Sequence, residues 1–320
     1  MTENREVWVF ADKPALLAEL MTGARELTPS GGSLVAILLG ARAQAEQALA
    51  RGAAKVLWLG EPGEHTLVDD YVPTLVNLVE QGQPYALLIG ATKRGRAIAG
   101  RLAARLKVTA LTDVLEFLHE NNGLQARHMI FGGGAVRIDR PLTETIVATV
   151  GPGVFDASAP NASATGGQGG IIEVPFVAPT VKMTLRERKT RPVAAVNLSG
   201  AKKVVCAGRG VGQQDDLQMI GELARLLGAE LACTRPLAEG LGWLPRERYL
   251  GISGATIRPD LYLGVGVSGQ VQHMIGMNRS RVVVVINKDQ NAPIFANADY
   301  GIAADLYAVV PALINALKNR

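Results

Sequence analysis

Short apolar runs alternate with helical patterns along most of this chain, and this alternation restricts the possible folds more than any other feature. In the first half, four strand-length runs are separated by segments whose apolar residues recur every three or four positions. Near-continuous Val, Ile and Leu strands joined by amphipathic helices predict an α/β protein with a parallel sheet covered on both faces. The runs are Val7–Phe10, Leu34–Leu39, Lys55–Leu59 and Ala86–Ile89, and the helical segments are 13–26, 42–52, 67–81 and 94–106.

The same alternation restarts near residue 195. A length of 320 residues fits two domains at roughly 150 residues each, with one large domain as the alternative. We predict an N-terminal α/β domain over 1–194 and a C-terminal Rossmann-like domain over 195–320, each with a mainly parallel sheet flanked by helices. In the second domain, strands are predicted at Lys203–Ala207, Leu231–Thr234, Leu261–Val267 and Val282–Ile286, and helices at Asp215–Leu227 and Leu306–Leu317.

The region from residue 124 to the end of the first domain has a different texture. Runs such as RHMIFGGGAVRID, TETIVATVGPG, IIEVPFV and VKMTLRER follow one another without a helical pattern between them. An antiparallel extension of the sheet is therefore expected here. The stretch 151–170 is rich in Gly, Ser, Ala and Pro and is expected to be a loop.

Charge and composition exclude several classes of protein. The net charge of +4 is small for a chain of this length, and aromatic residues make up only 5%, so neither a basic field nor stacking platforms for nucleic acid are expected. Cys206 and Cys233 lie in apolar runs without metal-ligand spacing, which favours buried thiols in a reducing compartment. The N-terminus has no signal-peptide core, and no apolar run approaches ~20 residues. A cytoplasmic protein that is not embedded in a membrane is the expectation.

Two glycine-rich turns follow predicted strands of the second domain. Residues 264–269 read GVGVSG, with Asp289 twenty residues further on, which matches a dinucleotide fingerprint only formally because the first two glycines belong to the strand. What remains is a turn at Ser268 and Gly269 that opens the helical run QVQHMIGM, where free N–H groups favour an anionic or electron-rich ligand. The turn GRGVG at 208–212 presents Arg209, whose guanidinium suits phosphate; a simple tight turn is the alternative.

His273 lies one helical turn after Gly269. A lone histidine is more often structural, but this position faces the glycine turn, where a side chain that titrates near neutral pH would offer positive charge or a donor to a ligand carbonyl. The basic residues between Lys93 and Arg105 are interpreted as a solvated or interface face of a helix. No Ser/His/Asp order, carboxylate pair or Walker loop indicates hydrolysis or phosphoryl transfer.

A longer segment carries a family resemblance. From Leu261 to Leu306 the chain reads LYLGVGVSGQVQHMIGMNRSRVVVVINKDQNAPIFANADYGIAADL, and CTRP at 233–236 and LGISGATIRP at 250–259 precede it. This resembles the signature of electron transfer flavoprotein alpha subunits: G-I/V-S-G-x-x-Q-H, then I-N-K-D, then A-P-I-F-x-x-A-D-Y-G-I-x-x-D-L. The first domain is similar in layout and in pieces such as VATVGPGVF. The FixB-like branch is closest in texture.

The resemblance implies a set of FAD-binding positions in the second domain. Arg209 and Thr234 (usually Ser in the family) would hold the phosphates, Arg235 would lie over the ring system, and the Ser253 hydroxyl would point toward flavin N5. His273 and the helix dipole would face the pyrimidine carbonyl, where negative charge accumulates on reduction. The remaining positions are Leu250, Gly251 and Ile252 at the ring edge, Ser268, Gly269, Gln270, Val271 and Gln272 in the helix turn, and Asn287, Asp305 and Leu306 at the nucleotide.

The resemblance also implies a function and partners. The chain would be the FAD-binding alpha subunit of a heterodimeric electron carrier, not an enzyme with a substrate turnover of its own. Its first domain would dock a beta subunit that holds AMP or a second FAD. Electrons would come from dehydrogenases and pass to a quinone oxidoreductase or another acceptor. Ile252 replaces the usual Gln, so one amide contact to the flavin is missing, and an electron-bifurcating complex becomes an option.

Two other hypotheses belong to different classes. A nicotinamide-dependent dehydrogenase would use the Gly264–Gly269 fingerprint, would oxidise a substrate with NAD and would contain no flavin. A non-redox nucleotide-binding scaffold would be colourless even when produced with its partner.

Overall fold

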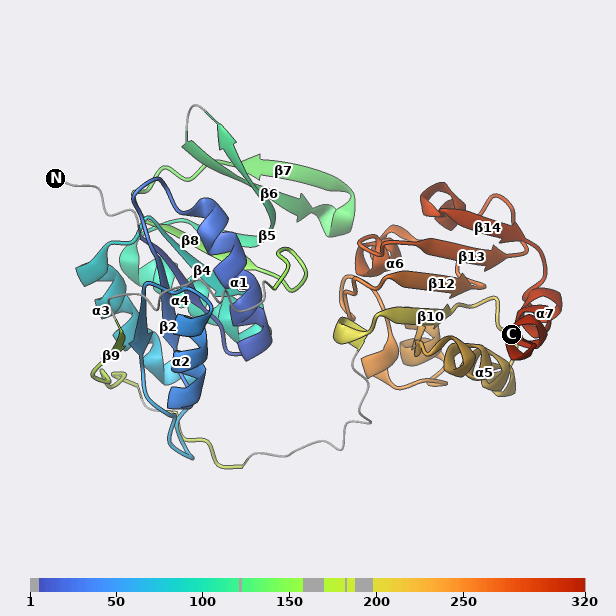
Figure 1. Cartoon of the computed structure of the whole chain (residues 1–320), viewed down its shortest axis with the longest axis horizontal. Coiled ribbons are helices and arrows are strands. Elements are labelled where there is room, and N and C mark those ends of the chain that lie inside the picture. The colour runs from blue at the N-terminus through green and yellow to red at the C-terminus, as the bar shows by residue number, and fades with distance from the viewer. Residues whose placement is uncertain (1–5, 121–122, 158–169, 182, 188–197, 320) are drawn as a thin grey trace. The chain divides into compact units, whose positions relative to one another are not determined.

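The structure is a computed structural model that describes residues 6–120, 123–157, 170–181, 183–187 and 198–319. The chain divides into two compact units, residues 1–130 with 136–190 and residues 191–320 with 131–135. The boundary predicted after residue 194 lies outside the described residues. Both units are α/β with mainly parallel sheets flanked by helices, as predicted (Figure 1).

The N-terminal unit contains a nine-stranded sheet in the order β7-β6-β5-β8-β4-β1-β2-β3-β9. Its strands are β1 Val7–Phe10, β2 Leu34–Leu38, β3 Lys55–Trp58, β4 Ala86–Gly90, β5 Ala110–Glu120, β6 Gly123–Ile130, β7 Ala135–Asp139, β8 Ile146–Val150 and β9 Ile171–Glu173. Its helices are α1 Pro14–Leu27, α2 Arg42–Ala50, α3 Val72–Gly82 and α4 Lys93–Leu106. All four predicted helices and the first four predicted strands are confirmed.

Side-chain alternation along β1 explains how both faces of this sheet are covered. Val7 and Val9 belong to the buried cluster that includes residues of α1 and α2, whereas Trp8 and Phe10 belong to the cluster that includes residues of α3 and α4. Successive strand residues point to opposite faces, so a strand with no polar position has to be covered on both sides. The sequence VWVF therefore fixes β1 as a central strand.

The prediction of an antiparallel extension is only partly correct. β6 does pair with β5 in antiparallel orientation. However, β8 pairs in parallel with both β4 and β5, and β9 pairs in parallel with β3. All five residues of β8 are buried, which is typical of an interior strand in a parallel sheet. The described part of the fourth run, residues 183–187, contains no strand.

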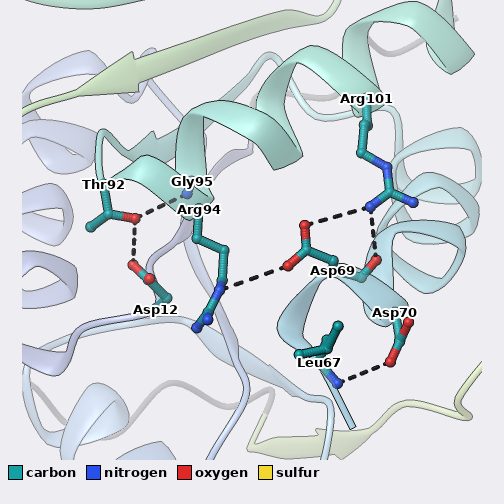
Figure 2. A network of polar contacts seen from close by, with 8 residues as sticks. All are labelled: Asp12, Leu67, Asp69, Asp70, Thr92, Arg94, Gly95 and Arg101. Atoms are coloured by element: carbon teal, nitrogen blue, oxygen red, sulfur yellow. Dashed lines mark hydrogen bonds and ion pairs between the residues drawn. The ribbon is translucent and has the colours of Figure 1, made fainter. Parts of the chain in front are cut away.

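A polar network links the start of α4 to two other segments of the N-terminal unit (Figure 2). The Thr92 hydroxyl accepts the Gly95 N–H at 2.9 Å, which caps α4, and donates to Asp12 Oδ1 at 2.8 Å. Asp69, in a 3-10 turn before α3, lies 3.7 Å from Arg94 and 3.6 Å from Arg101. Part of the basic face of α4 is thus paired with Asp69, and the carboxyl ends of β1 and β4 are joined by side chains.

The C-terminal unit contains a five-stranded parallel sheet in the order β11-β10-β12-β13-β14. Its strands are β10 Lys203–Ala207, β11 Glu230–Cys233, β12 Leu261–Val265, β13 Val283–Asn287 and β14 Tyr300–Ala303, and its helices are α5 Leu217–Leu227, α6 Val271–Met277 and α7 Leu306–Lys318. Buried residues of α5 and α7 share one cluster, and Met277 of α6 belongs to another. The sheet is therefore covered on both faces. β14 was not predicted, since all four of its residues are exposed.

Candidate functional site

A pocket of about 480 Å³ lies at the carboxyl edge of the C-terminal sheet. In chain order the strands run 2-1-3-4-5, so the direction of winding reverses between β10 and β12, and the turns after both strands line the pocket. Open α/β sheets bind ligands at such a switch point, and the volume is within the range of roughly 300–1,000 Å³ of small-molecule sites. Of the predicted residues, the pocket is lined by Arg209, Thr234, Arg235, Leu250, Gly251, Ile252, Ser253, Ser268, Gly269, Gln270, Gln272, His273 and Asn287.

The two glycine turns meet backbone to backbone. Gly210 N–H donates to the Gly266 carbonyl at 2.9 Å, and Gly266 has φ +65°, in the left-handed region. A Cβ on Gly266 would lie 2.8 Å from Gly210 Cα. Gly266 therefore needs glycine for both conformation and space, and Gly210 needs it for space. The close contact lets a ligand approach peptide groups directly at the switch point.

Thr234 contributes a buried hydroxyl that lacks a partner. The residue is 9% exposed and lines the pocket directly after β11. Its Oγ1 has no hydrogen-bond partner among the described residues. A buried polar group without a partner costs about 1–3 kcal/mol. A ligand oxygen or N–H in the pocket would remove that cost.

The pocket is lined by two permanent cations and one anion. Arg209 and Arg235 follow β10 and β11, and Asp289 follows β13. Arg235 is ion-paired with Glu239 at 2.5 Å, and this contact raises the pKa of the guanidinium. The Asp289 N–H and carboxylate are engaged in local turns with Asn287 and Asn291. Asp289 is thus used locally, and Arg209 and Arg235 place positive charge in the pocket, with the charge of Arg235 partly offset by Glu239.

His273 does not supply the positive charge that was predicted for it. The ring is 7% exposed, and Nδ1 lies 3.2 Å from the Leu250 carbonyl while Nε2 lies 2.8 Å from the Tyr262 hydroxyl. Burial lowers the pKa of His273 to about 4, although the bond to Leu250 opposes the shift. With a carbonyl as its partner, Nδ1 carries the proton, and Nε2 accepts from Tyr262. His273 is therefore a neutral residue that fixes the Leu250 backbone.

The helix predicted over the run QVQHMIGM is confirmed as α6. It begins at Val271, one residue later than predicted, and ends at Met277, seven residues in all. The run from Ser268 to Gln270 is an extended turn before it, whose Gly269 has φ +87°. A helix of two turns supports only a weak dipole. The turn and the first helical residues, Gln272 and His273 among them, line the pocket together.

The turn over 250–253 is held in place from two directions. Ile252 N–H donates to the Gln272 carbonyl at 2.9 Å. The Tyr249 hydroxyl donates to Ser253 Oγ at 2.8 Å. Because Ser253 accepts this bond, its own hydroxyl hydrogen stays available for a ligand. Ile252, which is 49% exposed, adds apolar surface where the family has an amide.

Three predicted positions do not line this pocket. Val271 is exposed, Asp305 caps α7 by accepting the Tyr307 N–H at 2.9 Å, and Leu306 is buried in the core under that helix. Lining residues that were not predicted are Gly210, Tyr249, Pro236, Gly266, Val267, Asp289, Ala292 and Pro293. All of them except Tyr249 belong to motifs quoted from the sequence and could have been found there: Gly210, Gly266, Val267 and Asp289 to the glycine turns and the fingerprint, and Pro236, Ala292 and Pro293 to CTRP and A-P-I-F.

The fold and the pocket define a class: a two-unit α/β protein whose second sheet binds a ligand with anionic groups at its switch point. Comparisons with known proteins specify it further. Residues 11–178 match the electron transfer flavoprotein domain, and residues 197–278 match the electron transfer flavoprotein FAD-binding domain. The chain belongs to the electron transfer flavoprotein family, as an alpha subunit that binds FAD and transfers electrons.

Full-length relatives agree with this assignment. A putative electron transfer flavoprotein subunit, YdiR, from Escherichia coli (strain K12) is 40% identical over 318 residues, which cover 99% of this chain and 100% of the relative. Protein FixB from Escherichia coli O139:H28 and from Shigella flexneri are each 39% identical, with 99% of both chains covered. The dehydrogenase and scaffold alternatives receive no support from these findings.

The residues of the pocket fit FAD. The unpartnered Thr234 hydroxyl and the two bare glycine turns suit phosphate oxygens, and two arginines supply the opposite charge. Both cysteines are buried and free, as predicted, and burial raises the pKa of Cys233 to about 12. In the described part of the chain, no helix is long and apolar enough to cross a bilayer.

Proposed function

We propose that the pocket holds FAD with its phosphates at Arg209 and Thr234 and its ring system at Arg235 and the turn over 250–253. The observation that carries this arrangement is the buried Thr234 hydroxyl, which has no partner among the described residues and lines the same pocket as the two arginines. FAD supplies the one-electron chemistry when bound. The protein binds the phosphates, covers the ring with Leu250 and Ile252, and provides charge and hydrogen bonds at its edge.

Each side chain near the ring has a separate role. Arg235 supplies a permanent positive charge toward the accumulating negative charge of the reduced cofactor. Ser253 donates its hydroxyl hydrogen. His273 keeps Leu250 in place as a neutral ring and contributes no charge of its own. Asn287 positions the turn after β12, since its amide donates to the Val267 carbonyl at 2.7 Å. Val271, Asp305 and Leu306 do not line the pocket. They lie near the nucleotide part of FAD through their backbone alone.

We further propose the electron path and the assembly. The chain forms a heterodimer with a beta subunit that carries AMP or a second FAD, through its N-terminal unit. Dehydrogenases donate electrons, a quinone oxidoreductase or another acceptor receives them, and the chain acts as a carrier in the cytoplasm. The family supports the carrier role, and two free cysteines fit a reducing compartment. Ile252 in place of Gln favours a dedicated or bifurcating pathway.

The test is to produce the chain together with its neighbour-encoded beta subunit. The purified pair should show flavin absorption bands and one FAD per alpha subunit, or two per pair if beta also carries FAD. Stepwise reduction should proceed in two resolved one-electron stages. A pair that remains colourless after incubation with excess FAD would contradict the proposal.

A further inference from the structure

A carboxylate next to the pocket lies between two arginines. Glu239 Oε2 is 2.5 Å from Arg235 Nε, and Glu239 Oε1 is 3.1 Å from Arg246 Nε. The Glu239 side chain is 26% exposed, whereas the two arginine side chains are 67% and 70% exposed. Each oxygen therefore serves one guanidinium, and the carboxylate is the better ordered centre of the cluster. Arg246 does not line the pocket, but Arg235 does.

The backbone around Glu239 is anchored in the core. Arg235 immediately precedes the π-helical turn Pro236–Gly240. Leu237 in this turn is completely buried, and its N–H donates to the Thr234 carbonyl at 3.1 Å. Residues four apart on a helical turn are neighbours, so Glu239 projects on the same side as Arg235. The bond uses Nε of Arg235 and not its terminal Nη groups, which points the guanidinium without covering its far edge.

Stability alone gives little reason for this cluster. Ion pairs between exposed side chains typically contribute about 0–1 kcal/mol. The net charge of the cluster gives a better reason. Two guanidinium groups and one carboxylate leave the cluster with a single net positive charge. The guanidinium of an arginine that is paired with a carboxylate has a fixed orientation, and the carboxylate partly offsets its electrostatic field. Both properties affect a neighbouring group whose charge changes by one on reduction.

We propose that Glu239 is the positioning residue for Arg235 and that its negative charge holds the first one-electron potential of the bound FAD below the value that an unpaired Arg235 would set. The inference rests on the proposed function, since it requires FAD beside Arg235. In the step concerned, one electron passes from the donor dehydrogenase to FAD, which gains one negative charge. Arg235 favours this charge, and Glu239 reduces that preference through Arg235.

The experiment compares Glu239→Gln with wild type in the co-purified alpha–beta pair. Glutamine keeps an oxygen for Arg235 Nε but removes the charge. We expect unchanged FAD content and an approximately threefold more favourable first reduction step, which is an increase of about 30 mV at 59 mV per tenfold. Glu222→Gln is the matched control, since Glu222 also pairs with a cation, Lys318, at 2.7 Å and is not among the pocket-lining residues. It should leave the potential unchanged.

A double-mutant cycle separates action through Arg235 from a general charge effect. In an Arg235→Gln background, measured with excess FAD, the additional change Glu239→Gln should alter the first potential by clearly less than it does in the wild-type background, because only the direct effect of the carboxylate charge remains. A shift of the same size in both backgrounds, or an equal shift in the Glu222→Gln control, would overturn the inference. So would a Glu239→Gln pair that retains FAD at the wild-type potential. Failure of the wild-type pair to bind FAD would instead contradict the proposed function.

Discussion

The two sheets of this protein reverse their winding in a similar way, but the two switch points differ in chemistry. In the N-terminal unit the reversal lies between β1 and β4, where the Asp12 carboxylate and the Thr92 hydroxyl bond directly to each other (Figure 2). In the C-terminal unit it lies between β10 and β12, where glycine turns meet and the nearby Thr234 hydroxyl lacks a partner among the described residues. Fold topology creates a switch point in both sheets, and the side chains decide which one accepts a ligand.

Whether a polar side chain has hydrogen-bond partners within the protein indicates its role better than its position alone. Thr92 and Thr234 both follow strands at a carboxyl edge. Thr92 makes two bonds within the protein, to Gly95 and Asp12, so it stabilises the helix that it caps. The hydroxyl of Thr234 makes none. Its unused bonding capacity is a cost that a ligand in the pocket would offset.

The largest expected effect comes from filling the glycine contact with Gly266→Ala. A Cβ would meet the Gly210 backbone, and φ +65° is unfavourable for alanine, so we expect a loss of about 2–4 kcal/mol in unfolding free energy. FAD should be lost from the purified pair. Urea denaturation and FAD content are the measurements.

Gly100→Ala is the matched control in the N-terminal unit. Gly100 lies within α4, and a Cβ there would meet open space, so a gain of up to about 1 kcal/mol is expected with full FAD content. Equal FAD loss in both variants would contradict the idea that FAD binding depends specifically on the contact between Gly210 and Gly266.

The second effect concerns the pH dependence of the C-terminal unit. The folded pKa of His273 is about 4, below its ordinary value of about 6.5. Between these values the unfolded chain binds a proton that the folded chain does not. Stability should therefore fall as the pH is lowered from 6.5 toward 4, by up to about 3 kcal/mol from this residue.

His273→Gln should flatten this dependence, since glutamine does not titrate. Urea denaturation of the full chain at pH 7, 5.5 and 4.5 measures the difference between variant and wild type. Parallel curves would show that folding leaves the pKa of His273 at its ordinary value, which would allow the ring to become charged near neutral pH as predicted from the sequence.

The next smaller effect is expected at Thr234, the threonine that lines the pocket. Thr234→Val removes the unpartnered hydroxyl and keeps the shape of the side chain. We expect an approximately tenfold weaker affinity for FAD, about 1.4 kcal/mol, with unchanged or slightly higher stability without FAD. A fluorescence titration of the FAD-depleted pair measures the affinity. Unaltered affinity would remove Thr234 from the binding site.

The smallest effect is expected at the N-terminal switch point. Thr92→Val removes the cap of α4 and the bond to Asp12, so the chain should lose about 1 kcal/mol of stability, observed as a lower urea midpoint. Affinity for FAD should not change. If Thr92→Val weakened FAD binding as much as Thr234→Val does, the distinction between the N-terminal and the C-terminal switch point would be wrong.

The sequence predicts most of the fold because most of the parallel strands are nearly continuous apolar runs. VWVF and KVVCA appear at their predicted positions as β1 and β10. The orientation of β8 was wrongly predicted, although its continuous burial was visible in the run TIVATV. β14 was missed because an exposed edge strand with the sequence YGIA lacks an apolar pattern.

The sequence indicates which residues line the pocket, but not the hydrogen-bond partners or the protonation state of their side chains. Family motifs locate Arg209, Thr234 and the turn over 250–253, which all line the pocket. They do not show that Tyr262 and the Leu250 carbonyl occupy both nitrogens of His273, because these partners meet the ring only in the folded chain. The same holds for Glu239, whose two arginine partners are defined by the course of the chain around one turn.

The contact between Gly210 and Gly266 also has a bearing on how the pocket can be redesigned. The contact is made by main chain alone, which mutation cannot vary, whereas Ile252, Ser253 and Gln272 line the same pocket with side chains that can be replaced. A library directed at those three positions should yield carriers of altered redox character, whereas any library that includes the two glycines should consist mostly of empty proteins.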